Sequence, residues 1–189
     1  DGPAQRGHRA HAAGPLMKTS DSQDLPASTA SASADAPAPD GPAVPEGFIV
    51  MRMPANPFID GIGPLYGRLE DDHFVMGIRV EQRHCNPGGT CHGGMVMTLS
   101  DMLLLMGSNI EGRVNRYFTT VNVTCDFIAP APMGSWIEGR MQVLRVARSL
   151  VFAQGLFTIG DTVVARCSGI LKPVSEPDPR YDGRRYFEG

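Results

Sequence analysis

The segment from Gly93 to Gly107 would be apolar around nearly its whole circumference if it formed a helix. A helix of this kind must be buried on more than one side, because water cannot cover an apolar face. We therefore expect it to lie inside a curved sheet, with one flank left for a second subunit. Its large apolar residues are Met95, Val96, Met97, Leu99, Met102, Leu103, Leu104, Leu105 and Met106.

Five segments around this helix have the features of β-strands. Residues 73–82, HFVMGIRVEQ, alternate between apolar and mostly polar positions, which is typical of a half-buried strand. Short links join the four later strands and imply antiparallel pairing. The predicted fold is α+β, a five-stranded antiparallel sheet wrapped around one central helix. The later strands are expected over 121–128, 136–146, 150–159 and 162–171, the first with Val121, Val123, Cys125 and Phe127 on one face.

The composition narrows the class of protein. The chain has 189 residues, 42% apolar and 20% charged, with a formal charge of −3. This negative net charge argues against a nucleic-acid partner, because proteins that bind nucleic acids usually carry more basic than acidic residues. No run of 18 apolar residues is present, so we expect no membrane span. Four cysteines in a chain without a secretion signal are expected to be reduced thiols, and we expect a cytoplasmic protein.

Both ends of the chain differ from its middle. Residues 1–46 contain no aromatic side chain and include a low-complexity Ala, Ser, Pro and Asp stretch, so we expect a disordered tail. Met17 is a candidate natural start, with residues 1–16 foreign to the native chain. One domain is expected over 47–174, followed by a loose polar tail over 175–189.

The turn before the central helix and the one carboxylate within it suggest a reaction centre. Gly93 and Gly94 would expose backbone N–H groups at a helix start, where they can stabilise a developing oxyanion. Asp101 would supply a base or nucleophile in apolar surroundings. Along a helix these groups lie roughly 12 Å apart, at ~1.5 Å per residue. Two antiparallel copies of the helix could bring Gly93 of one subunit beside Asp101 of the other, so we expect a homodimer with two shared sites.

The pattern Asn86-x5-His92-Gly93-Gly94-x6-Asp101, followed by TTVNVTCDFIAPAPMG, resembles the PaaI-type hotdog-fold acyl-CoA thioesterases. The resemblance implies hydrolysis of an acyl-CoA without a metal or other cofactor. It assigns Asp101 as base or nucleophile, the Gly93 N–H as donor to the thioester oxygen, and Asn86 as a group that holds the carbonyl or the attacking water. Thr120 would assist the carboxylate. The family also builds its sites across dimers and often pairs these into tetramers.

The resemblance also places substrate contacts outside the reaction centre. The family's Gly-Arg turn corresponds to residues 147–149 here, which makes Arg148 and Ser149 candidate contacts of the CoA phosphates. Gly94 joins them as a substrate-binding candidate. This chain has Ala129 where family members often carry a basic residue.

A zinc site and a cysteine nucleophile fit the residues around the turn less well. Residues 84–85 and 91–92 flank the turn with His and Cys, but the Cys-x5-Cys spacing is wider than a usual zinc site. Cys91 lacks a group that would activate it as a nucleophile. His92 is expected to shape the turn rather than to transfer protons. The alternative functions are an enoyl-thioester hydratase or dehydratase with this fold and a non-catalytic acyl-CoA sensor.

Overall fold

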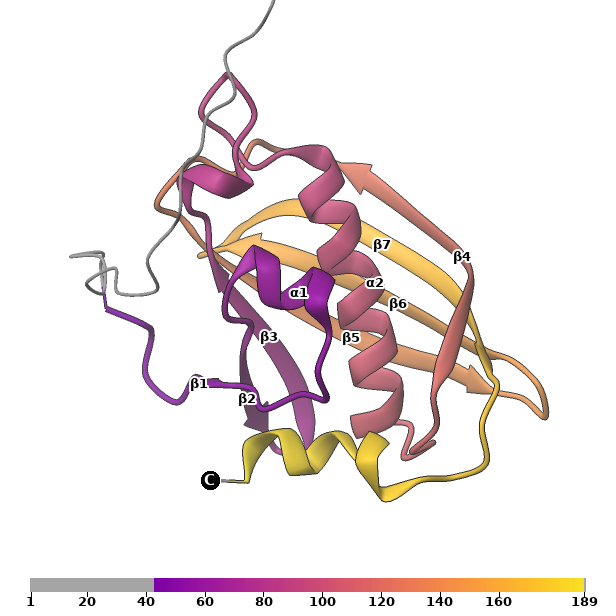
Figure 1. Cartoon of the computed structure of the whole chain (residues 1–189). Helices are drawn as coiled ribbons and strands as arrows, with labels where there is room; N and C mark the ends of the chain where they lie inside the picture. The colour runs from indigo at the N-terminus through magenta and orange to yellow at the C-terminus, as the bar shows by residue number, and fades with distance from the viewer. Residues whose placement is uncertain (1–42, 189) are drawn as a thin grey trace, which may run out of the picture. The chain divides into compact units, whose positions relative to one another are not determined.

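The structure, a computed structural model, describes residues 43–188, so the tail expected over residues 1–42 lies outside the described residues. Seven strands form one antiparallel sheet in the order β1-β2-β3-β5-β6-β7-β4 (Figure 1). The strands are β1 (Ile49–Val50), β2 (Tyr66–Glu70), β3 (His73–Arg79), β4 (Phe118–Phe127), β5 (Trp136–Val146), β6 (Val151–Ile159) and β7 (Thr162–Pro173). The helices are α1 (Pro57–Ile62), α2 (Gly93–Ile110) and the 3-10 turns η1 (Gln82–His84), η2 (Pro179–Tyr181) and η3 (Gly183–Phe187).

The predicted hotdog architecture is confirmed, with a difference at one edge of the sheet. The five expected strands correspond to β3–β7, and β1 and β2 extend the sheet beyond β3. The turn from β2 to β3 has positive φ at both Asp71 and Asp72. This is the backbone of a type I′ hairpin, which Asp tolerates. Strand β2 went unpredicted because it is short and rich in polar and small residues.

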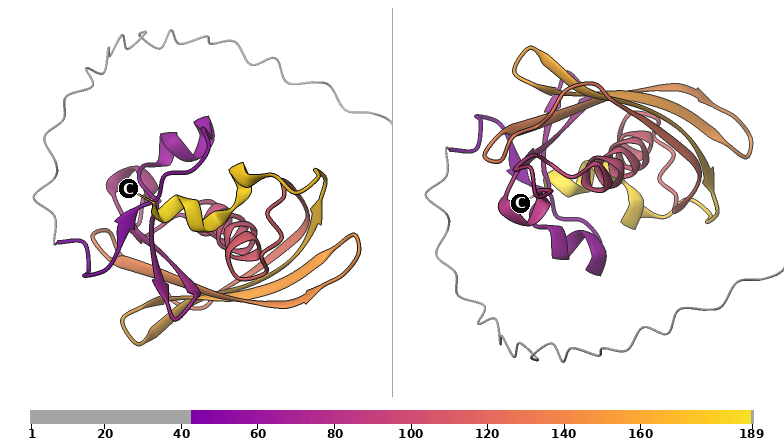
Figure 2. Two further views of the ribbon diagram at one scale, coloured as in Figure 1. Left: turned by 90° about the horizontal axis from the view of Figure 1, so that it is seen from below. Right: turned by 90° about the horizontal axis from the view of Figure 1, so that it is seen from above.

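The central helix is covered on two sides, as its apolar circumference predicts. Leu99, Leu103 and Leu104 are at most 1% exposed in the core. The curved sheet lies along one side of α2, while α1 and the C-terminal 3-10 turns cover the other (Figure 2). α2 is the longest helix in residues 43–188, yet no helix among them has the length and hydropathy to cross a membrane.

The expectation of a loose tail after Pro173 is wrong for the residues that the structure describes. η3 contacts the C-terminal end of α2. Tyr186 is 5% exposed, and a Cβ at Gly183 would lie 2.3 Å from the Ile110 side chain. The segment looks polar in sequence because of its Arg and Asp residues, but its aromatic side chains are enough to anchor it against the helix end.

Candidate active site

The turn that precedes α2 is closed by Asn86. Its side-chain oxygen accepts the Gly88 N–H at 2.9 Å, and its amide nitrogen donates to the Thr90 hydroxyl at 3.0 Å. Cys85 and Cys91 face each other across the base of the turn as a β-bridge. Asn86 therefore fixes the shape of the turn, and one amide proton beyond the Thr90 bond remains for a further acceptor.

His92 is the N-cap of α2. Its Nδ1 accepts the Gly94 N–H at 2.8 Å, and its carbonyl accepts the N–H groups of Met95 and Val96. This arrangement agrees with the interpretation of His92 as a turn-shaping residue. It also distinguishes the two glycines as donors, because the Gly94 N–H already donates to His92. The Gly93 N–H has no acceptor within residues 43–188 and is the free donor at the helix start.

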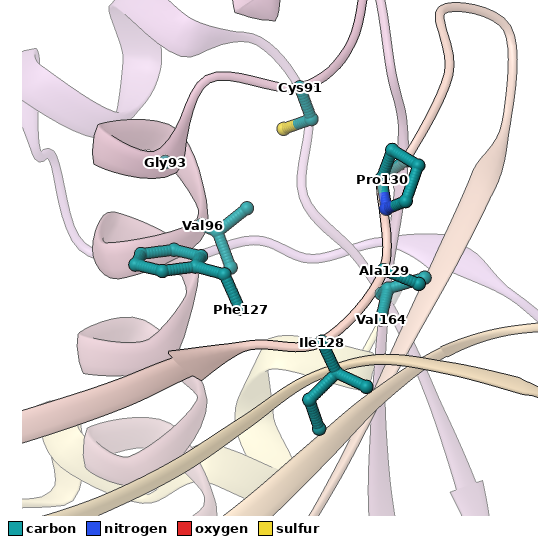
Figure 3. Close-up of a pocket in the computed structure, with 9 residues that line it drawn as sticks. Cys91, Gly93, Val96, Phe127, Ile128, Ala129, Pro130 and Val164 are labelled. Atoms are coloured by element: carbon teal, nitrogen blue, oxygen red, sulfur yellow. The ribbon is translucent and has the colours of Figure 1, made fainter.

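Gly93 borders a cavity of about 360 Å³ between the first turns of α2 and the end of β4 (Figure 3). The Phe127 ring covers this glycine, since a Cβ there would lie 3.4 Å from the ring. Phe127 was expected only as a strand residue, and nothing in the alternation distinguishes it from its neighbours. Cys91 also lines the cavity, but burial raises its pKa to about 11. Its thiol is therefore protonated at neutral pH and unsuited to act as the nucleophile.

Asp101 lies half-buried in the middle of α2. The Thr120 hydroxyl, on β4, donates to the Asp101 carboxylate at 2.6 Å. The structure thus brings together two of the predicted site residues, separated by 19 positions in the chain. A hydroxyl that donates to one carboxylate oxygen orients the group and leaves the other oxygen available for a proton or a substrate.

A β-bulge in β4 turns Thr120 toward α2. Thr120 pairs with Leu171 and Asn122 pairs with Ile170, which leaves Val121 as an extra residue. In a regular strand, residues 120 and 123 would face opposite sides of the sheet. The bulge lets Thr120 reach Asp101 while Val123 packs against the core. The expectation that Val121 shares a face with Val123 is wrong, because Val121 is the extra residue of the bulge and is 57% exposed. Cys125 and Phe127 share the face of Val123 as expected, since the register is regular from Val123 to Phe127.

Within one subunit, Gly93 and Asp101 stay on separate turns of the same helix. Eight residues separate them, or roughly 12 Å along the axis. β4 is the edge strand of the sheet, with β7 as its one neighbour. Its side chains are exposed on both faces over most of its length, including Val121 at 57% and Phe127 at 59%. An apolar edge beside the candidate site is suited to a partner subunit.

Arg148 and Ser149 form the exposed turn between β5 and β6, apart from these groups. Val151 pairs with Leu171, which pairs with Thr120, so this turn lies at the sheet end where β4 begins. Neither side chain makes a hydrogen bond with the residues that the structure describes. Among those residues, no three His, Cys, Asp or Glu side chains gather as metal ligands.

Comparison with known proteins assigns the chain to a family. The model of the thioesterase superfamily matches residues 88–166. A Pseudomonas aeruginosa protein named as a presumed esterase is 32% identical over 129 residues, which cover 68% of this chain and 96% of that protein. Acyl-coenzyme A thioesterase 13 of Mus musculus is 28% identical over 82 residues, 43% of this chain and 58% of that protein.

Solved structures agree on the fold. A zebra fish thioesterase superfamily member 2 is 28% identical, covers 59% of this chain and 80% of its own, and superposes with a TM-score of 0.52. A mutant of the phenylacetic acid degradation protein PaaI from Thermus thermophilus gives 0.55 at 22% identity, with coverages of 63% and 100%. Since the family match runs from the glycine turn through α2 and into β7, and the Pseudomonas protein aligns over nearly its whole length, this chain belongs to the thioesterase superfamily.

Proposed function

We propose that this protein is an acyl-CoA thioesterase that hydrolyses its substrate to a free acid and CoA. Membership of the thioesterase superfamily and the likeness to an acyl-coenzyme A thioesterase support the reaction class. The observation that carries the proposal is the Thr120–Asp101 hydrogen bond at 2.6 Å. This hydrogen bond holds a half-buried carboxylate inside the central helix. A carboxylate in such a place is uncommon unless it has a partner or a function.

The reaction needs an oxyanion donor and a group that delivers the nucleophile. The Gly93 N–H donates to the thioester oxygen as negative charge develops there, at the positive end of the α2 dipole. Asp101 either takes a proton from the attacking water or attacks the carbonyl carbon itself, giving a mixed anhydride that a water molecule then hydrolyses. A new C–O bond forms and the C–S bond breaks. The CoA sulfur leaves with the electron pair and is protonated, and the acyl group departs as the carboxylic acid.

The two parts of this machinery come from different subunits of a homodimer. The separation of Gly93 and Asp101 along α2 rules out one small reacting centre that touches both in a single chain. Pairing across β4 would bury Val121 and Phe127 and satisfy the open edge of the sheet. The dimer presents Arg148, Ser149 and Asn86 to the CoA and the carbonyl, and two dimers associate as a tetramer.

The test is release of free thiol from a panel of acyl-CoAs, followed with a thiol reagent. We expect multiple turnovers without added metal or cofactor. A change in enoyl absorbance without thiol release would indicate the hydratase alternative, and binding without turnover would indicate a sensor. Turnover in H₂¹⁸O followed by mass spectrometry of the Asp101 peptide tests the nucleophile role of the carboxylate. Label in Asp101 identifies a nucleophile, because water has then opened the anhydride at the aspartyl carbon.

A further inference from the structure

A second cavity lies on the other flank of α2, away from Gly93. It measures about 170 Å³ and is enclosed by α2, the start of β4, the segment before α1 and the C-terminal 3-10 turns. Met102, Leu105 and Phe118 form its apolar wall. Met53 and Tyr181 close it from segments that lie outside the residues 88–166 matched by the family model. The cavity therefore depends on parts of this chain that the family match does not include.

The cavity begins next to the proposed reaction centre. Leu105 follows Asp101 by four positions, so the two side chains lie on one helix face, about 5–6 Å apart. On β4, Phe118 precedes Thr120 by two positions and shares its face. Both elements lead from the carboxylate in the same direction, toward the cavity. An acyl group whose carbonyl is held at Asp101 would extend into it.

Polar side chains also line the cavity, and two of them, Tyr186 and Arg116, are donors suited to a carboxylate. Tyr186 is 5% exposed as a residue and lines the cavity. Its hydroxyl oxygen is not among the fully buried side-chain atoms that lack a partner, so it is reached by solvent and is available to donate to a bound ligand. Burial raises the pKa of Tyr186 to about 12, which keeps the hydroxyl a donor at neutral pH. The Tyr186 backbone is held by the Arg52 N–H at 3.1 Å.

Arg116 is the second donor on the wall. Its main chain is fixed by the buried Asn109, whose side chain bonds both the Arg116 N–H and the Arg116 carbonyl at 3.1 Å. The guanidinium has one acidic neighbour among the described residues, Glu176 at 3.8 Å, whose side chain is 94% exposed. Such a long and solvated pair leaves the guanidinium free to bind a second carboxylate.

We propose that this cavity binds the acyl group and selects a short chain that ends in a second carboxylate, held by Arg116 and Tyr186. A cavity of about 150 Å³ lined by apolar side chains holds one benzene ring in another protein, so this one fits about six carbon atoms. The apolar wall contacts the methylene groups, and the donors bind the far end. This inference rests on the proposed thioesterase activity and names its substrate class.

The test compares adipyl-CoA, hexanoyl-CoA, acetyl-CoA and palmitoyl-CoA by thiol release. We expect kcat/KM for adipyl-CoA to exceed that for hexanoyl-CoA at least tenfold, and palmitoyl-CoA to be the poorest substrate. Arg116→Met and Tyr186→Phe should each remove most of the preference for adipyl-CoA while hexanoyl-CoA turnover stays within a few-fold. Arg113→Met and Tyr66→Phe are matched controls, because neither residue lines the cavity.

The outcomes separate this inference from the function on which it rests. Thiol release from no acyl-CoA would refute the thioesterase itself. Hydrolysis with equal or better rates for hexanoyl-CoA, or an adipyl preference that survives both variants, would overturn the carboxylate-binding cavity alone. Leu105→Trp tests the cavity by a second route, since filling it should lower kcat/KM for adipyl-CoA far more than kcat/KM for acetyl-CoA. Equal loss on both substrates with an unchanged circular dichroism spectrum would also refute the cavity's role.

Discussion

At the scale of single residues, the proposed chemistry depends on a carboxylate that is held without a countercharge. Asp101 has a hydroxyl partner at 2.6 Å and no cationic partner among the described residues. A salt bridge would hold the carboxylate but compete with its attack on a carbonyl or its removal of a proton. A neutral donor orients the group without adding a countercharge and leaves the second carboxylate oxygen free to react, which suits a base or nucleophile.

Asp101→Asn is therefore expected to lower kcat by roughly a hundredfold or more. The amide has nearly the shape of the carboxylate but cannot accept a proton or form the acyl intermediate. Steady-state thiol release measures the effect, with thermal melting to confirm folding. Activity within a few-fold of the parent in a folded variant would exclude Asp101 from the chemistry.

Thr120→Val removes the hydroxyl that orients Asp101 and keeps the branched shape. We expect kcat to fall about ten- to a hundredfold, because a hydrogen bond to a charged group contributes about 1.5–3 kcal/mol. Thr119→Val is the matched control, since Thr119 is the exposed neighbour on the same strand. Equal kcat values for the two variants would show that the Thr120 hydroxyl has no part in positioning the carboxylate.

The sequence could predict which residues matter more readily than how they are oriented. The spacing from Asn86 to Asp101 and its likeness to a known family were enough to propose Asp101 and Thr120, which the structure then places in contact. The orientation of Thr120 was not predictable, because the β-bulge at Val121 reverses the alternation on which strand patterns depend. Phe127 was missed for a related reason, since its contact with Gly93 joins two distant segments.

At the scale of elements, glycines in three neighbouring strands let α2 pack closely on the sheet. A Cβ at Gly139 or Gly155 would lie 3.1 or 2.9 Å from the Leu103 side chain, and one at Gly169 would lie 2.8 Å from Leu104. Contacts this close require the neighbouring side chains to shift, so larger residues at these positions would disturb the packing of α2 on the sheet. The position of Asp101 over β4 depends on this spacing.

Gly155→Ala is expected to destabilise the fold by about 1–3 kcal/mol, because the new Cβ would also lie 2.9 Å from the Arg140 carbonyl, which cannot move aside easily. For a domain of this size the melting temperature falls about 2–4 °C per kcal/mol. Gly61→Ala in α1 is the control. Nothing lies within 4 Å of its Cβ, and the change should be neutral or stabilising. Differential scanning calorimetry that finds the two variants equally stable would contradict this account of the packing.

Elements with a strong periodic pattern were predictable, and those held by a few contacts were not. α2 and the strands β3–β7 have long apolar patterns, and the structure places each within a few residues of its expected range. η3 is too short and too polar for any periodic signal. It packs because two side chains, Tyr186 and Phe187, reach the core from an otherwise charged segment. Sequence patterns report average burial along an element and miss single anchors of this kind.

At the scale of the whole molecule, the described subunit leaves β4 as an unpaired sheet edge beside the candidate site. β4 carries Thr120 at the site and exposes apolar side chains along its edge. A partner that pairs with this edge would cover the apolar surface and bring its own α2 beside the first. Dimerisation and catalysis would then depend on the same strand, so that an isolated subunit would be inactive.

Complementation between two inactive variants tests the shared site. Gly93→Val should block the carbonyl pocket, since the Phe127 ring already lies 3.4 Å from a Cβ there. Asp101→Asn disables the base or nucleophile. Each variant alone should be nearly inactive. In a mixed dimer one site combines an intact Gly93 with an intact Asp101, while the other site carries both lesions. Random exchange makes about half of the dimers mixed, so activity should return to about a quarter of the parent value.

The measurement is thiol release from the two variants refolded together, with differently tagged chains to prove exchange and size-exclusion chromatography to prove dimers. Mixing either variant with itself is the control and should restore nothing. If exchange is complete and no activity returns, no site combines Gly93 of one subunit with Asp101 of the other, and the shared-site mechanism is wrong. Recovery near a quarter requires that each site takes its donor from one subunit and its carboxylate from the other. The exposed edge of β4 would then have a catalytic reason for its apolar residues, because pairing there assembles the site.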